Sequence, residues 1–388
     1  MLANRLPIPE RQEKKGRQAQ VIPFNKRVII GVEIEAYSID LSEHKIGRRL
    51  SKPRRGLSES GERFTRDTSI GSEYNSRPFT TIREALFLLK SGLRKYLRGL
   101  YRSTNPDQED YRMPLLVGGW TNRFAGTHMH ISLAERPLSA KDASSLAWHL
   151  HDHIPLLIAL GANSPVWGKH VTSVASNRML RGSEAYFSPL KRGELNSSAL
   201  RELVYSRGRK TKPATLEVRV LDSNLPEFIV ANMAIVKAVC LRWLKRKSAT
   251  NRIPHAAYLQ ARQEAGLRGM KAKLPWKDEM LSVRQYLDRF LWEHRDEFAA
   301  MDIPDEIYET LRLLKRGYNG ACIFREAALL AVNEHPQTWQ RRFAKRYSQG
   351  LERLLSGDPL RDFAEALQVP LPSTDRVWLG RKRASIGE

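Results

Sequence analysis

The sequence is poor in cysteine and has no long apolar run. Its two cysteines, Cys240 and Cys322, belong to no CxxC pair, which argues against a cysteine-built metal site or a disulfide scaffold. We expect both thiols to be reduced and buried, as in a cytoplasmic protein. No apolar run approaches the ~18 residues of a membrane span. The basic residues 1–20 lack the apolar segment of a secretory signal.

Acidic residues are also scarce relative to basic ones. The chain has 42 Asp and Glu against 65 Lys and Arg, a formal net charge of +23. Such a field attracts nucleic acid, nucleotides or acidic substrates. The sequence contains no zinc finger, no RNP-type aromatic strand and no clear recognition helix, so a nucleic-acid partner stays open without a motif to support it.

The 388 residues are many for a single core, so we expect more than one region. Residues 1–25 are predicted as a basic flexible arm, 26–225 as an α+β catalytic region, and 226–388 as a mainly helical region packed on it. Several short strands lie close together in the sequence, which favours a mainly antiparallel sheet with flanking helices. Strands are predicted at 26–40, 125–133 and 214–224, and helices at 80–102 and 139–161. Residues 161–213 are predicted to be irregular.

The first chemical signal is a pair of acids in an apolar strand, "GVEIEAYSID". Glu33 and Glu35 are two residues apart, so in a strand both point to one face. Two neighbouring carboxylates repel each other, and a divalent cation between them removes that cost. Oxygen ligands favour Mg²⁺ or Mn²⁺. The alternative is a solvent-facing strand with two ordinary surface acids.

Polar clusters recur in two further segments. "RDTSIGSEYNSRP" places Asp67 and Glu73 near each other, and "GTHMHIS" carries His128 and His130 on one face of a strand. Paired imidazoles can ligate a metal or donate to phosphate. A second histidine group, at positions 149, 151 and 153, follows a helix beside apolar residues, and we assign it no metal role.

Arginines complete the pattern. In "LEVRVLD", Glu217 and Arg219 share a strand face, where they could form a plain ion pair or serve metal and phosphate separately. In "SNRMLRG", Arg178 and Arg181 are expected in a Ser/Gly-rich loop that could cradle phosphate.

These segments, together with "PLLIALGANSPVWG", resemble the glutamine synthetase-like carboxylate–amine ligases, in the glutamate–cysteine ligase and amidoligase branch. The resemblance covers about residues 28–225. It implies a curved antiparallel sheet that forms a funnel, with metal ions at its waist and ATP entering one end. It implies metal ligands at Glu33, Glu35, Glu73, His128 and Glu217. It implies nucleotide or phosphate contacts from His128, His130, Arg178, Arg181 and Arg219, and catalytic roles for Asp67, Arg178 and Arg219.

The expected function is therefore an ATP- and Mg²⁺- (or Mn²⁺-) dependent ligase that forms an amide or isopeptide bond through an acyl-phosphate. Its substrates would be a small-molecule or peptide carboxylate, acidic in view of the +23 charge, and an amine. Two alternatives stay open: a metal-dependent nuclease, which also uses clustered acids, and a guanidino-type phosphotransferase on the same fold. Neither the substrates nor the oligomeric state is indicated by the sequence, and no membrane partner is expected.

Overall fold

The structure is a computed structural model. The residues it describes are 22–47, 61–65, 70, 72–98, 101–102, 109–110, 112–186, 188–190, 201–209, 212–246, 248–375, 377 and 379. Most of the predicted arm at 1–25 lies outside this range, as does Asp67.

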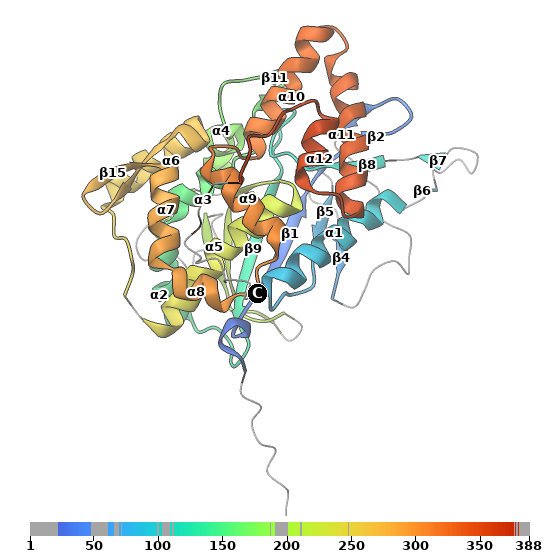
Figure 1. Cartoon of the computed structure of the whole chain (residues 1–388). Helices are drawn as coiled ribbons and strands as arrows, with labels where there is room; N and C mark the ends of the chain where they lie inside the picture. The colour runs from blue at the N-terminus through green and yellow to red at the C-terminus, as the bar shows by residue number, and fades with distance from the viewer. Residues whose placement is uncertain are drawn as a thin grey trace, which may run out of the picture.

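A six-stranded sheet runs through the centre of the molecule (Figure 1). Its strand order is β12-β13-β9-β1-β5-β4, and all five pairings are antiparallel. The strands are β1 (Val28–Glu35), β4 (Arg63–Thr65), β5 (Glu73–Asn75), β9 (Gly126–Leu133), β12 (Leu203–Ser206) and β13 (Thr215–Asp222). The predicted α+β class with a mainly antiparallel sheet is confirmed.

Smaller sheets surround the central one. They consist of β2 (Tyr37–Asp40), β3 (Lys45–Gly47) and β8 (Arg112–Leu115); β6 (Tyr101–Arg102) and β7 (Glu109–Asp110); β10 (Val166–Trp167) and β11 (His170–Val171); and β14 (Lys273–Trp276) and β15 (Glu279–Ser282). The described helices are α1 (Ile82–Arg98), α2 (Ala140–His151), α3 (Ile154–Gly161), α4 (Asn177–Tyr186), α5 (Pro226–Lys245), α6 (His255–Arg268), α7 (Val283–Glu293), α8 (Arg295–Ala300), α9 (Asp305–Lys315), α10 (Gly320–Glu334), α11 (Trp339–Ser356) and α12 (Leu360–Ala366), with 3₁₀ turns at Phe24–Lys26 and Gly269–Lys271.

The two faces of β1 differ in polarity. Val28, Ile30 and Val32 are buried, and the residues between them are half-buried. Side chains alternate across a strand, so the apolar set faces the helices, where α5 packs on β1 and α3 on β13. The opposite face carries Gly31 and Glu33. These helices therefore pack on the apolar face of the sheet, and Glu33 lies on the opposite face.

Three local predictions are wrong. Residues 161–213, predicted to be irregular, contain β10, β11, α4 and β12. The predicted helix 139–161 is two helices, although its cap is confirmed: the Ser139 hydroxyl accepts from the Asp142 N–H. Pro155 has no N–H and clashes with the preceding turn, so it is tolerated only where α3 starts afresh. The segment with Arg178 and Arg181 is helix α4, not a loop, because the Ser176 hydroxyl accepts from the Met179 N–H (3.0 Å) and caps it.

Beyond residue 225 the described chain is helical apart from the β14–β15 hairpin and short connections. The region packs back on the first half. Asn319, before α10, donates to the Ala159 carbonyl (2.8 Å), and Arg325 donates to the carbonyls of Thr172 and Val174. No described helix is both long and apolar enough to cross a bilayer. The proposed boundary near residue 225 stays a prediction.

Acid should destabilise this fold through buried neutral histidines. His294 is 1% exposed and stacks on Phe290; burial lowers its pKa to about 3, and burial also lowers the pKa of His153. Below pH 6.5 the unfolded chain binds protons that the folded chain does not, so stability falls as the pH decreases toward 3. At pH 5 the loss through His294 is about 2 kcal/mol, and His153 acts in the same direction.

Denaturant unfolding at pH 7 and pH 5 measures this loss. The His294→Phe variant should show a shallower pH dependence than the parent protein. The matched control His335→Gln replaces an exposed histidine and should keep the parental slope. Equal slopes in all three proteins would contradict the assignment.

Candidate active site

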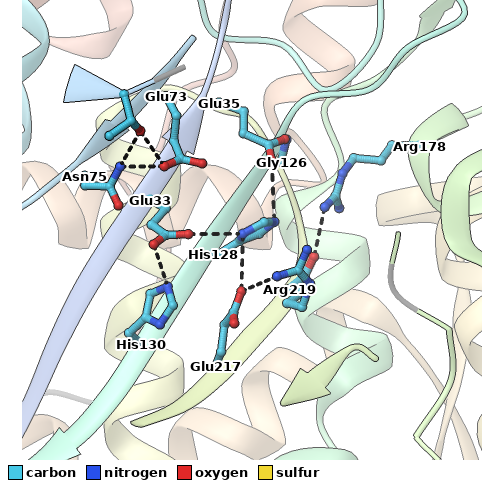
Figure 2. Close-up of polar contacts among 11 residues, drawn as sticks. Glu33, Glu35, Glu73, Asn75, Gly126, His128, His130, Arg178, Glu217 and Arg219 are labelled. Carbon is cyan, nitrogen blue, oxygen red and sulfur yellow. Dashed lines mark hydrogen bonds and ion pairs between the residues drawn. The ribbon is translucent and has the colours of Figure 1, made fainter. Parts of the chain in front are cut away.

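The strand registers bring the predicted polar residues into rows across the sheet. Glu33 pairs with Asn75 on one side and with His128 on the other. His130 lies between Gly31 and Glu217, and Glu35 lies opposite Glu73. Neighbouring strands are only about 4.8 Å apart. Segments far apart in the sequence therefore form one polar cluster (Figure 2).

Both histidines contact the carboxylates. His128 is buried, and its Nδ1 lies 3.3 Å from Glu217 Oε1 and 3.6 Å from Glu33 Oε2, while its Nε2 lies 4.0 Å from Glu35 Oε1. His130 Nε2 lies 3.3 Å from Glu33 Oε1. Glu33 thus lies between two imidazoles (Figure 2).

The ionisation of the cluster follows from these contacts. Burial alone would raise the pKa of Glu33, but the hydrogen-bonding imidazoles of His128 and His130 hold it well below its usual range. Burial alone would lower the pKa of His130, but the bond to Glu33 and the charge of Glu217 raise it. Protonated His130 therefore offsets part of the negative charge of Glu33 and Glu217.

A divalent metal ion fits this donor set. Ligand atoms of Glu33, His130 and Glu217 all lie within 4.8 Å of one another, the only such group of His, Cys, Asp and Glu among the described residues. Carboxylates suit Mg²⁺ and Mn²⁺, and an imidazole is a good ligand for the transition metals. The sequence-based assignment of His128 as a metal ligand stays a prediction, and in the structure it is His130 that completes this group.

Neighbouring groups fix one oxygen in each of two further carboxylates. Glu35 Oε2 accepts from the Gly126 N–H at 2.5 Å. Glu73 Oε1 accepts from Thr65 Oγ1 (2.8 Å) and Asn75 Nδ2 (2.5 Å). Such bonds orient a carboxylate for a metal or substrate. The sequence reasoning missed Thr65 and Asn75, although Asn75 is two residues from Glu73 and so shares its strand face, the criterion that identified Glu33 and Glu35.

Arg219 and Arg178 lie beside the carboxylates (Figure 2). Arg219 Nη1 donates to Glu217 Oε1 at 2.5 Å. Arg178 is 2% exposed, and its Nη2 donates to the Arg219 carbonyl at 3.1 Å. Its guanidinium packs so closely on Gly126 that a Cβ there would lie 2.3 Å from Nη2. Any side chain at position 126 would therefore displace Arg178.

A buried hydrogen-bond network supports the start of α4. Asp222 Oδ2 accepts from the Asn163 N–H (2.7 Å) and Ser164 Oγ (2.9 Å), and Oδ1 accepts from Ser176 Oγ (3.0 Å). Ser164 Oγ in turn accepts from the Arg178 N–H (3.0 Å). The motif "GANSPVWG" thus braces the strand end that carries Asp222 against the helix that carries Arg178.

Two predicted residues, Arg181 and Asp67, are not among the contacts described above. Arg181 is exposed on α4, where it donates to Asn177 Oδ1 (3.0 Å) and stacks 4.0 Å over Trp167. Neither contact involves one of the clustered carboxylates. Asp67 lies outside the described residues, so its predicted catalytic role has no geometry to support it.

Gly31 keeps space open in the cluster. It lies opposite His130 on the face of Glu33, and a Cβ built on it meets no atom within 4 Å. Glycine in a strand interior often marks close approach of a ligand. We expect Gly31→Val to fold normally, since valine suits a strand, but to bind nucleotide at least roughly 10-fold more weakly.

Calorimetric titration of Mg-ATP, with circular dichroism to check the fold, tests this expectation. Ile29→Val, on the same strand face, is the control for a mild change in β1. A Gly31→Val protein with parental nucleotide affinity would show that no ligand approaches this glycine.

Part of the chain that carries this site is similar to known ligases. Residues 106–181 match glutamate-cysteine ligase family 2 (GCS2). The predicted resemblance to that branch of the carboxylate–amine ligases is confirmed. The matched segment contains β8, β9, α2, α3 and the start of α4, and hence His128, His130 and Arg178. A glutamate–cysteine ligase of Haloquadratum walsbyi is 29% identical over 144 residues, which cover 32% of this chain and 38% of the relative.

Solved structures share the fold over most of the chain. The crystal structure of the complex between the prokaryotic ubiquitin-like protein Pup and its ligase PafA has a TM-score of 0.54 at 11% identity, covering 89% of this chain and 79% of that one. A bifunctional glutathione synthetase from Pasteurella multocida has a TM-score of 0.54 at 13% identity, covering 86% and 53%. At these identities the likeness is one of fold.

Proposed function

We propose that this protein is an ATP-dependent carboxylate–amine ligase that forms an amide or isopeptide bond and releases ADP and phosphate. The observation that supports it most directly is the convergence of Glu33, His130 and Glu217 on one point of the sheet, beside Arg219. The related family and the shared fold support the same chemistry.

The chemistry requires activation of the acid. A carboxylate is a poor electrophile. Transfer of the γ-phosphoryl group to it gives an acyl-phosphate and ADP, and an amine can then attack the acyl carbon and displace phosphate. Mg²⁺ or Mn²⁺, when bound, would neutralise phosphate charge. We assign its binding to Glu33, Glu217 and a histidine, with Glu35 and Glu73 at the edge of the same cluster.

The chain's own residues would perform the remaining tasks. Arg219 would hold the phosphoryl oxygens as negative charge develops. Arg178, which donates to the Arg219 carbonyl, would keep Arg219 in position. His128 would keep Glu33 and Glu217 in place through its Nδ1 contacts. Proton acceptance from the amine falls to a carboxylate, for which Asp67 remains our candidate.

The substrate acid is expected to be anionic beyond its reacting carboxylate. The net charge of +23 would attract an acidic peptide, a protein tail or a phosphorylated compound. One fold relative is a ligase of the protein Pup, and the curated relative is a glutamate–cysteine ligase, so both protein and small-molecule acids belong in the substrate screen.

An ADP-release assay tests the proposal. The purified chain, ATP and Mg²⁺ or Mn²⁺ are combined with panels of acids and amines, and products are identified by mass spectrometry. The expected result is a metal-dependent product whose mass is that of the acid plus the amine minus one water, formed together with one ADP per amide bond. A stable phosphorylated product that forms without any amine would instead identify a phosphotransferase, and cleaved nucleic acid without ATP use would identify a nuclease.

A further inference from the structure

A second hollow lies away from the carboxylate cluster. A cavity of about 700 Å³ opens between the end of α2, the segment 249–254 and the start of α6. Its volume falls within the range of small-molecule sites, about 300–1,000 Å³. Its main lining residues are Trp148, His151, Asp152, Arg252, Ile253 and His255, none of which belongs to β1, β9 or β13.

One side of this cavity is aromatic. The His151 ring stacks on Tyr258 with centroids 3.9 Å apart, and His255 lies nearly parallel to His151 at 6.2 Å and 20°. Trp148 lies 5.1 Å from His151 and keeps 36% of its surface exposed. The exposed His255 ring lies nearly parallel to His151 and Tyr258 and offers a face to another flat ring, whereas the Trp148 ring is tilted by 58° to His151 and offers a contact at an angle.

The cavity also contains charges of both signs. Asp152 is only 6% exposed, and its carboxylate has two long contacts in the described part of the chain, both 3.4 Å from Oδ1, to His151 Nδ1 and the Ile253 N–H. A carboxylate accepts about four hydrogen bonds, so Asp152 has capacity for a cationic donor. Arg252 is exposed and forms no ion pair with a described carboxylate.

A metal ion does not explain this histidine-rich wall. Among the described residues, the group with ligand atoms in mutual reach is Glu33, His130 and Glu217, and the histidines of this cavity form no such group. His149, beside them, uses Nδ1 to donate to the Ser145 carbonyl at 2.8 Å, as an ordinary helical side chain does.

We propose that this cavity binds an aromatic α-amino acid. Its ring would stack on His255 and pack against the tilted Trp148, its ammonium group would bind Asp152, and its carboxylate would bind Arg252. An aromatic ring next to an ammonium and a carboxylate matches the three kinds of surface that line the cavity. The site is separate from the proposed ligase chemistry, so either proposal can fail alone.

Calorimetry with the full chain tests this site, using four probes: L-phenylalanine, L-tyrosine, L-tryptophan and L-histidine. Saturable binding of at least one, in the absence of ATP and metal, is expected. For an aromatic probe such as L-phenylalanine, two analogues separate the charges: phenethylamine lacks the carboxylate, and 3-phenylpropionate lacks the ammonium. Each should bind roughly 10- to 100-fold more weakly, the effect of one lost charge-assisted hydrogen bond.

Variants assign the contacts. Asp152→Asn, which keeps the side-chain shape and the Oδ1 acceptor, should weaken the amino acid roughly 10-fold or more and leave 3-phenylpropionate unchanged. Arg252→Gln should weaken the amino acid and leave phenethylamine unchanged. The control Asp278→Asn changes an exposed acid outside the cavity. Absence of saturable binding by all four probes, or parental affinity in Asp152→Asn, would overturn the proposal.

Discussion

Glu33→Gln should abolish metal-dependent ATP turnover, with a loss on the order of 100-fold or more. Among the described residues, Glu33 is the only carboxylate paired with both histidines within 4.0 Å, at 3.6 Å from His128 and 3.3 Å from His130, and it belongs to the one group there whose ligand atoms could share a metal ion. The amide has nearly the same shape, so packing is preserved, but it removes the negative charge that a cation needs. Glu217→Gln should behave in the same way.

Two measurements separate this loss from misfolding. Manganese affinity, followed by electron paramagnetic resonance, should fall along with turnover, while the thermal unfolding midpoint changes little. Glu279→Gln serves as the matched control, because Glu279 is exposed on β15 and pairs only with Arg289 in the described chain. A fully active Glu33→Gln protein would refute the central assignment.

Arg219→Lys should lower kcat by roughly 100-fold or more, the size seen when one transition-state donor is removed. The guanidinium of Arg219 reaches Glu217 with Nη1 at 2.5 Å and keeps further N–H donors for a ligand. A lysine retains the charge but offers a point donor in place of a planar fork, so it cannot bridge the acid and a phosphoryl oxygen in the same geometry.

The backbone contacts of position 219 should survive this change. Its backbone N–H donates to the Glu202 carbonyl, and its backbone carbonyl accepts from the Arg178 guanidinium. Neither bond involves the side chain of residue 219. Steady-state kinetics should therefore show a larger effect on kcat than on KM for ATP. Arg289→Lys, at an exposed pair, controls for the substitution type. An Arg219→Lys enzyme with parental kcat would exclude a role for the fork.

Much of the candidate site could be predicted from local rules. Period-two spacing identified Glu33 with Glu35, His128 with His130, and Glu217 with Arg219, and each pair does lie on strands of one sheet. The same rule would have found Asn75. The rule could not find Thr65, since nothing in its neighbourhood distinguishes it until Glu73 is placed beside it.

Long-range placement lay beyond those rules. The helix around Arg178 is mispredicted as a loop, although Ser176 directly before it is a local cap signal. The packing of this helix depends on distant residues: Asp222 accepts from Ser176, and Met179 lies against Gly266. The cavity beside Asp152 is a similar case. In the sequence its histidines look like ordinary helical residues. They line a cavity only because α6 and the segment before it pack near the end of α2.

By itself the sequence determined the chemical character of this protein: an α+β chain with a basic surplus whose acids, imidazoles and guanidinium groups recur at strand spacing. It did so because side-chain direction along a strand is a local property. Only the tertiary structure decided which of these groups meet. Register between β1, β9 and β13 depends on burying one whole face of the sheet, and that free energy belongs to the assembled core and to no single segment.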